Sequence, residues 1–159
     1  NTEYSLPLVY HLLDVACVGE YLWDKWLCEE VKSFIEIYIP NARSLFLLSC
    51  YIHDLGKSSD FFQGQLDGSK TSDWKDHVHL TNRIIAQYLF SDFNSNYYKI
   101  EDSFLLELVS YHHGIQLSTI IDASIDKKHF LCFEEVNQYI DCVLNKLGLT
   151  KDCFYLTFF

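Results

Sequence analysis

Helix-breaking residues are scarce in this chain, and their scarcity constrains the fold more than any other feature of the sequence. The 159 residues include only 2 Pro and 6 Gly. Apolar residues recur every three to four positions through much of the chain, which is the period of one face of an α-helix. Pro7 and Pro40 each precede such a segment, where proline is tolerated. The pattern therefore predicts an all-α fold, a bundle of about six helices.

The periodic segments give the positions of the predicted helices. We expect helices over residues 8–27, 42–55, 76–90, 102–113 and 133–147, and a sixth that begins at residue 152. Gly56, Gly114 and Gly148 each follow one of these segments, as is common after the last residue of a helix. Residues 58–75 are rich in Ser, Asp, Gly and Lys and predict a loop, and residues 118–125 predict a short strand or a turn.

Apolar stripes run along three of the predicted helices, and we expect these stripes to face the core. They are His11, Val15, Val18 and Leu22 in the first helix, His77, Leu80, Ile84 and Tyr88 in the third, and Val136, Ile140, Val143 and Leu147 in the fifth. Two of the three stripes include a histidine. The predicted bundle therefore holds imidazole groups at or near its interior.

The composition is that of one globular domain. Hydrophobic residues make up 49% of the chain and aromatic residues 16%, which is enough for a core and too much for a disordered chain. No apolar run approaches the about 18 residues of a membrane span, so we expect no membrane association. The chain ends within the apolar run of residues 154–159. We therefore interpret residues 1–159 as a single domain that is part of a longer chain.

Charge and cysteine spacing narrow the possible functions. The formal net charge is −10, whereas a protein that binds nucleic acid through its own surface is usually basic. If this chain acts on nucleic acid, a metal must supply local positive charge and a partner must deliver the substrate. The 6 Cys form no CxxC pair, which argues against a cysteine zinc site. It favours buried free thiols in a cytoplasmic protein.

Histidines recur at an end or on an apolar stripe of four predicted helices. They are His11, His53 next to Asp54, His77, and the pair His112 and His113. Burying such groups without partners would cost about 1–3 kcal/mol each. A shared metal site satisfies them together, because imidazole and carboxylate are the usual ligands of borderline divalent metals. Since a carboxylate has two oxygens, Asp54 can bridge two ions. The sequence thus predicts a metal site between helices.

Two assignments in the predicted site admit more than one interpretation. His77 and His79 compete for one ligand position, and we favour His77 because it shares its stripe with Leu80 and Ile84, whereas His79 shares a more polar line. Lys57 follows a predicted helix end. Its ammonium can complement the helix dipole or, beside a metal site, bind a phosphate oxygen.

Four segments together resemble a known family. Residues 53–57 read HDLGK and resemble the HDxGK signature of HD-domain phosphohydrolases. The early histidine of residues 11–16, the histidine at the start of residues 76–81 and the paired histidines before glycine in residues 111–114 complete the pattern. In this order the segments resemble the HD nuclease domain of the type I CRISPR-associated helicase-nuclease. One feature departs from that family, because no Asp of this chain matches its further metal-binding Asp on a late helix.

The resemblance implies a fold, a cofactor and a mechanism. It implies an HD-domain helical bundle that binds two divalent transition-metal ions, Fe, Mn, Ni or Co. Asp54 would bridge the ions, with His11 and His53 nearer one ion and His77, His112 and His113 nearer the other. Metal-activated hydroxide would attack a phosphodiester phosphorus, with Asp54 and Lys57 as the catalytic residues. The implied partners are single-stranded DNA, a helicase domain or chain, and the CRISPR RNA-guided surveillance complex.

Two other functions remain open from the sequence. One is an HD-type phosphohydrolase that acts on a small-molecule nucleotide. The signalling-nucleotide enzymes of that class share HDxGK, but their downstream Gly-Tyr-Pro element is absent here. The other is a helical module that binds metal without turnover.

Overall fold

The computed structural model describes residues 7–66, 68, 77–89, 97–99, 103–114, 120–122 and 133–150. They form α1 (Leu8–Tyr21), a π-helix (Leu22–Trp26), α2 (Glu29–Tyr38), α3 (Ala42–Ile52), a 3-10 helix (Leu55–Ser58), α4 (Asp60–Leu66), α5 (His77–Leu89), β1 (Tyr97–Lys99), α6 (Phe104–Ser110), β2 (Ile120–Asp122) and α7 (Phe133–Leu147). The two strands pair antiparallel with each other. The predicted all-α fold is confirmed, with this short strand pair as its only addition in the described ranges.

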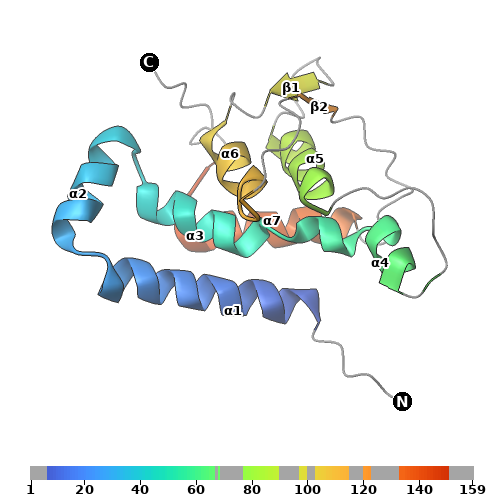
Figure 1. Cartoon of the computed structure of the whole chain (residues 1–159), viewed down its shortest axis with the longest axis horizontal. Coiled ribbons are helices and arrows are strands. Elements are labelled where there is room, and N and C mark those ends of the chain that lie inside the picture. The colour runs from blue at the N-terminus through green and yellow to red at the C-terminus, as the bar shows by residue number, and fades with distance from the viewer. Residues whose placement is uncertain are drawn as a thin grey trace.

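Helix α3 lies at the centre of the bundle (Figure 1). Helix α1 packs along one side of it, α7 along another, and α6 contacts it next to α5. The α3 residues Leu48 and Ile52 are each 1% exposed, and they share one core with Ile84 of α5, Leu106 of α6 and Ile140 of α7. The carboxyl end of α3 therefore faces several helices at once, and this is where the His-Asp pair follows.

Helix α1 packs on α3 through small residues. Its buried side is formed by Leu12, Ala16 and Gly19, which are spaced four and three residues apart. A Cβ atom at Gly19 would lie 2.8 Å from Cys50 Sγ, so the missing side chain permits the close approach of the two helices. The predicted stripe of α1 is wrong for Val18, which is 59% exposed. The small residues lie on a neighbouring face and bring that face against α3.

The same correction applies to Leu22, which is 39% exposed. The predicted stripes of α5 and α7 are confirmed for the residues that dominate them, since Leu80, Ile84, Ile140 and Val143 are buried. The buried side of α5 also includes Val78, Ile85 and Ala86, and that of α7 also includes Val136 and Leu144.

Several predicted boundaries changed in the structure. The helix predicted over residues 8–27 is α1 followed by a π-helical turn. The one predicted to reach residue 55 ends at Ile52, and residues 133–147 form a helix as predicted. Residues 120–122 are a strand, as one of the two predicted alternatives required. The helix expected to begin at residue 152 lies outside the described residues.

Two helices were not predicted. The first part of the expected loop over residues 58–75 forms α4, which begins after the buried Ser59. The Ser59 hydroxyl accepts a hydrogen bond from the backbone N–H of Phe62, so Ser59 acts as the cap of this helix despite the glycines that follow. Helix α2 is amphipathic, yet none of its residues is buried.

The exposure of the cysteines and the length of the helices test two further predictions. Cys17, Cys28 and Cys142 are free but exposed, so the predicted burial is wrong for these thiols, and Cys50 is half-buried. Cys17 and Cys142 lie on outward faces of α1 and α7, and Cys28 precedes α2. None of the described helices is both long and apolar enough to cross a membrane.

Candidate metal centre

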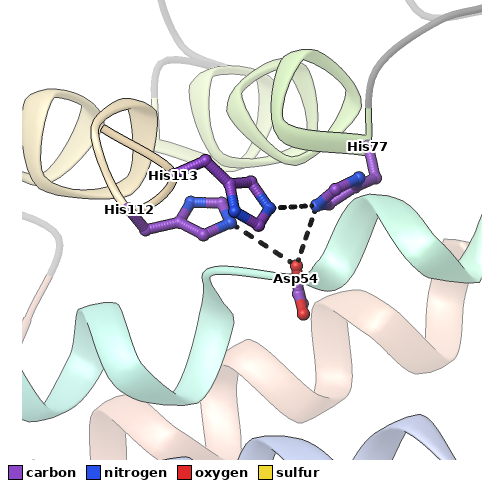
Figure 2. Close-up of side chains that lie close together, drawn as sticks. All are labelled: Asp54, His77, His112 and His113. Carbon is purple, nitrogen blue, oxygen red and sulfur yellow. Dashed lines mark hydrogen bonds and ion pairs between the residues drawn. The ribbon is translucent and has the colours of Figure 1, made fainter. Parts of the chain in front are cut away.

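Five of the predicted ligands converge on Asp54 from four parts of the bundle. His11 comes from α1, His53 from the end of α3, His77 from the first residue of α5, and His112 and His113 from the turn after α6. Figure 2 shows His77, His112 and His113 gathered over the Asp54 carboxylate. The structure thus brings together all six residues that the sequence proposed as metal ligands.

The residues form two groups that share Asp54. In the first group, His11 Nε2 lies 3.0 Å and His53 Nε2 lies 3.3 Å from Asp54 Oδ2. In the second group, His77 Nε2 lies 3.2 Å and His112 Nε2 lies 3.6 Å from Asp54 Oδ1. Each carboxylate oxygen therefore faces its own pair of imidazoles, as a bridging carboxylate between two ions would.

His113 completes the second group. Its Nε2 atom lies 2.9 Å from Nε2 of His77, and the rings of His112 and His113 lie with their centroids 4.2 Å apart. Atoms that all bind one ion at about 2.0–2.2 Å are separated from one another by about 3.0–3.5 Å. The separations in both groups are close to this range. The donor set and its spacing fit a divalent transition metal in each group.

Carbonyl groups at two helix ends fix the orientation of two of the histidines. His53 Nδ1 lies 2.9 Å from the carbonyl oxygen of Cys50, and His112 Nδ1 lies 2.6 Å from that of Val109. The last carbonyls of an α-helix lack intrahelical partners, so they are available as acceptors. With Nδ1 donating to such a carbonyl, Nε2 is left to bind a metal ion or, in the metal-free protein, to face the Asp54 carboxylate. In both residues Nε2 is the atom that faces Asp54.

Asp54 is buried but ionised. The residue is 2% exposed, and burial alone would raise the pKa of its carboxyl. The imidazoles of His112, His53 and His77 and the Lys57 ammonium outweigh that effect and hold the pKa of Asp54 well below its usual value. Within the part of the chain that the structure describes, Asp54 Oδ1 accepts no hydrogen bond. A buried anionic oxygen in this situation fits a cation better than it fits a purely structural role.

Lys57 lies in the same site. Its Nζ donates a hydrogen bond to Asp54 Oδ2 at 2.6 Å, so it contacts the oxygen that His11 and His53 also face. The side chain is 29% exposed, and the ring of Phe62 lies 6.0 Å from Nζ. The ammonium therefore lies between the Asp54 carboxylate and the surface of the domain.

Gly56 has a different role from the predicted one. We expected it to end a helix, but it lies within the 3-10 helix after Asp54 and does not adopt a positive φ. A Cβ atom here would lie 2.0 Å from the backbone oxygen of His77 and 2.8 Å from the backbone N of Thr81. Glycine is thus required because the backbone of α5 passes directly over the segment that carries Asp54.

The outcome for the competing histidines is clear in the geometry. His77 faces Asp54, whereas His79 belongs to neither of the two groups found among the described residues. The sequence reasoning missed two neighbours of the site, Thr81 and Phe62. The ring of Phe62 packs at 5.6 Å from that of His77, edge to face. Thr81 lies four residues after His77, one turn further along the same helix, and that spacing is the signal that could have pointed to it.

Comparison with known proteins gives one match. The family model described as "Cas3, HD domain" matches residues 1–149. No curated protein and no solved structure matches the chain. The matched range includes every residue of the two groups around Asp54.

Proposed function

This chain belongs to the Cas3 HD domain family, and we propose that it is a metal-dependent nuclease that hydrolyses single-stranded DNA in CRISPR interference. We also propose that residues 1–159 act as one HD-type nuclease domain. Its catalytic groups would be Asp54 and Lys57, and its metal ligands His11, His53, Asp54, His77, His112 and His113.

The observation that carries the proposal is the position of Asp54 between two histidine groups. Its two oxygens face different imidazole sets at 3.0–3.3 Å and 3.2–3.6 Å. A site for one structural ion is usually closed by four ligands, and it has no need of a second set. Paired sites are typical of enzymes that cleave phosphate esters, in which two ions act on the attacking and leaving oxygens.

The side chains of the site would divide the chemical work. When bound, two such ions supply an activated water near neutral pH and offset charge on the phosphate. The Asp54 carboxylate, ionised in its buried position, holds the two groups at a fixed separation. Lys57 would leave Asp54 Oδ2 and donate to a phosphoryl oxygen as negative charge develops there. Since the ions activate water, the proposed reaction uses no serine or cysteine nucleophile.

Access to the site favours a polymeric substrate. His113 is exposed, and the side chains of His11 and Lys57 are 38% and 29% exposed. The two groups therefore reach the surface on more than one side of Asp54. A strand can lie across such a site, whereas a nucleotide enzyme encloses its substrate in a pocket.

The charge of the chain supports dependence on a partner. With a net charge of −10, the domain repels the DNA backbone except where metal ions and Lys57 reverse the local field. We therefore propose that a helicase domain or chain, acting with the RNA-guided surveillance complex, delivers the strand. The proposed ions are Fe, Mn, Ni or Co, because imidazole-rich sites disfavour Mg and Ca.

The test is cleavage of a labelled single-stranded DNA by the protein with Mn²⁺ or Ni²⁺ added, compared with Asp54→Ala. Asp14→Ala is the matched control, because Asp14 is an exposed carboxylate on α1 outside both groups. We expect metal-dependent cutting by the wild type and by Asp14→Ala, and none by Asp54→Ala.

A second substrate panel separates the alternatives. Duplex DNA and mononucleotides are incubated under the same conditions. Turnover of nucleotides without cutting of DNA would favour the small-molecule phosphohydrolase. Metal binding with no hydrolysis of any substrate would favour a module that binds metal without turnover.

A further inference from the structure

Two adjacent polar residues of α5 are buried next to the candidate metal centre. Thr81 is 0% exposed and Asn82 is 1% exposed, among helix residues that are otherwise mostly apolar. Buried polar side chains are retained where they form specific hydrogen bonds. The bonds of these two residues lead to the elements that carry the other ligands.

Thr81 joins α5 to the segment that carries Asp54. Its Oγ1 accepts a hydrogen bond from the backbone N–H of Gly56 at 2.8 Å and donates to the backbone oxygen of His77 at 2.9 Å. Gly56 is two residues from Asp54. The Thr81 hydroxyl thus connects the segment that carries Asp54 to the backbone of His77. The two backbones can come this close because Gly56 has no Cβ.

Asn82 joins α5 to α6. Its Nδ2 donates to Ser110 Oγ at 2.7 Å, and Ser110 Oγ donates to the backbone oxygen of Leu106 at 2.6 Å. Ser110 is the last residue of α6 and is 1% exposed. His112 and His113 follow after Tyr111, in the turn that ends at Gly114, whose φ is +71°. The position of α6 relative to α5 therefore sets the position of these histidines relative to His77.

We propose that Thr81 and Asn82 act as paired positioning residues that assemble the second metal-binding group, Asp54 with His77, His112 and His113. The inference rests on the proposed metal-dependent function. The residues of this group come from three places: the segment after α3, the start of α5, and the turn after α6. From α5, Thr81 hydrogen-bonds to the first of these and Asn82 to the last residue of α6. The histidines of the first group, His11 and His53, are carried by α1 and the end of α3, and neither polar residue hydrogen-bonds to these helices. The bond of Thr81 holds α5, and with it His77, against the Asp54 segment, but it does not fix His11 or His53 relative to Asp54.

This asymmetry gives a specific expectation. Loss of either hydrogen bond should weaken the ion of the second group and leave that of the first group in place. Residues that orient metal ligands typically contribute about 10–100-fold to metal affinity. We therefore expect Thr81→Val and Asn82→Ala to lower the affinity for one of two Mn²⁺ ions by that factor.

In the experiment, metal-free protein is titrated with Mn²⁺. Calorimetry measures the number and affinity of the bound ions, and electron paramagnetic resonance shows whether two Mn²⁺ ions are coupled. The wild type should bind two ions and show the signal of a coupled pair. At Mn²⁺ concentrations that saturate the wild type, Thr81→Val and Asn82→Ala should bind one ion and show the signal of isolated Mn²⁺. Thr81→Ser keeps the hydroxyl and should restore the coupled pair.

Tyr139→Phe is the control for a general loss of stability. The Tyr139 hydroxyl donates to the backbone oxygen of Tyr51 at 3.0 Å, so the variant also removes one hydrogen bond between two helices, α7 and α3. It should melt at a lower temperature and bind both ions as the wild type does. If Asn82→Ala fails to fold, Ser110→Ala removes the same hydrogen bond from the α6 side with a smaller change in volume.

The outcomes separate the positioning role from the function on which it rests. Wild-type protein that binds no Mn²⁺ would overturn the metal-dependent function, and the positioning role with it. Wild-type protein with two ions, and Thr81 and Asn82 variants with both affinities unchanged, would overturn the positioning role alone. Equal weakening of both ions in the variants and in Tyr139→Phe would also overturn it, because it would reflect general loosening of the fold.

Discussion

At the scale of single residues, Asp54 is the residue that both groups of the site share. A carboxylate that is 2% exposed is costly to keep ionised unless cations or hydrogen-bond donors surround it. Here the imidazoles of His112, His53 and His77 and the Lys57 ammonium do so, and these three histidines also belong to the two candidate metal-binding groups. The stability of the apo fold and its capacity to bind metal are therefore linked through one side chain.

The lowered pKa of Asp54 predicts how acid affects the metal-free protein. A carboxyl whose pKa is lower in the folded than in the unfolded state adds stability that is fully present above the unfolded value of about 3.9. That stability is lost as the pH falls through the folded value. We expect the contribution of Asp54 to be intact at pH 4 and to decline at lower pH.

Urea denaturation of wild type and Asp54→Asn in EDTA, at a series of pH values, measures this contribution. The gap in unfolding free energy between them should narrow only below about pH 4. If the difference in unfolding free energy between wild type and Asp54→Asn already disappears between pH 6 and pH 4, the carboxyl is not held in its ionised form.

Lys57 offers a way to separate catalysis from metal binding. Lys57→Met removes the ammonium and keeps the length of the side chain. We expect DNA cleavage to fall by about 10²-fold or more, because a group that stabilises developing charge typically contributes that factor. Mn²⁺ affinity should not decrease, since Lys57 and a cation meet the same Oδ2 atom of Asp54. Loss of Mn²⁺ binding in this variant would instead assign Lys57 to the structure of the site.

At the scale of the elements, helix ends and one close backbone contact bring the ligands together. His53 and His112 follow the carboxyl ends of α3 and α6, whose last carbonyls accept from their Nδ1 atoms. The 3-10 helix after Asp54 lies against the start of α5, with Gly56 at the point of contact. These are properties of how elements end and meet, and they involve few side chains.

Gly56→Ala tests that contact. Its Cβ would lie 2.0 Å from a backbone oxygen, and backbone cannot move aside as a flexible side chain can. We expect a loss of about 1–3 kcal/mol or more in unfolding free energy and weaker Mn²⁺ binding, because α5 must shift away from Asp54.

Gly19→Ala is the comparison. The nearest atom to its Cβ is the Cys50 thiol at 2.8 Å, the end of a side chain that can rotate. It should destabilise the protein less and leave Mn²⁺ binding unchanged. Equal effects of the two substitutions on metal binding would show that the α5 contact has no special part in the site. Denaturant unfolding and Mn²⁺ titration provide both measurements.

At the scale of the whole molecule, the site exists only in the folded bundle. His11 and Asp54 are 43 residues apart in the sequence and 3.0 Å apart in space, and His77 and His113 are separated by 36 residues. The unfolded chain cannot present these ligands to one ion. Metal binding must therefore stabilise the fold.

This coupling predicts a rise in melting temperature with metal. At a free Mn²⁺ concentration 100 times its dissociation constant, one ion adds about 2.7 kcal/mol. For a domain of this size that corresponds to an increase in Tm of about 5–10 °C, to be measured by thermal unfolding with and without EDTA. Asp54→Asn should show little or no increase. A Tm that is insensitive to metal in the wild type would argue against both groups as metal sites.

The sequence by itself determined the local properties of this protein. The period of its apolar residues identified α1, α3, α5, α6 and α7 but not α2 or α4, and α7 begins and ends where that pattern places it. The chemistry of imidazole and carboxylate identified the candidate ligands. The position of His53 and Asp54 near a helix end could also be predicted, because a few neighbouring residues determine where a helix ends. The cap at Ser59 is equally local, but the glycines after it hid α4 from the pattern.

Only the tertiary structure decided which of these residues meet. It placed Ala16 and Gly19 of α1 against α3 in place of the larger Val18, because small residues allow the closer packing. It gave Gly56 its function at the crossing with α5, and it joined Thr81 and Asn82 to elements on either side. Periodicity describes one helix at a time, whereas these contacts depend on the distance and angle between helices, which the packing of residues far apart in the sequence sets.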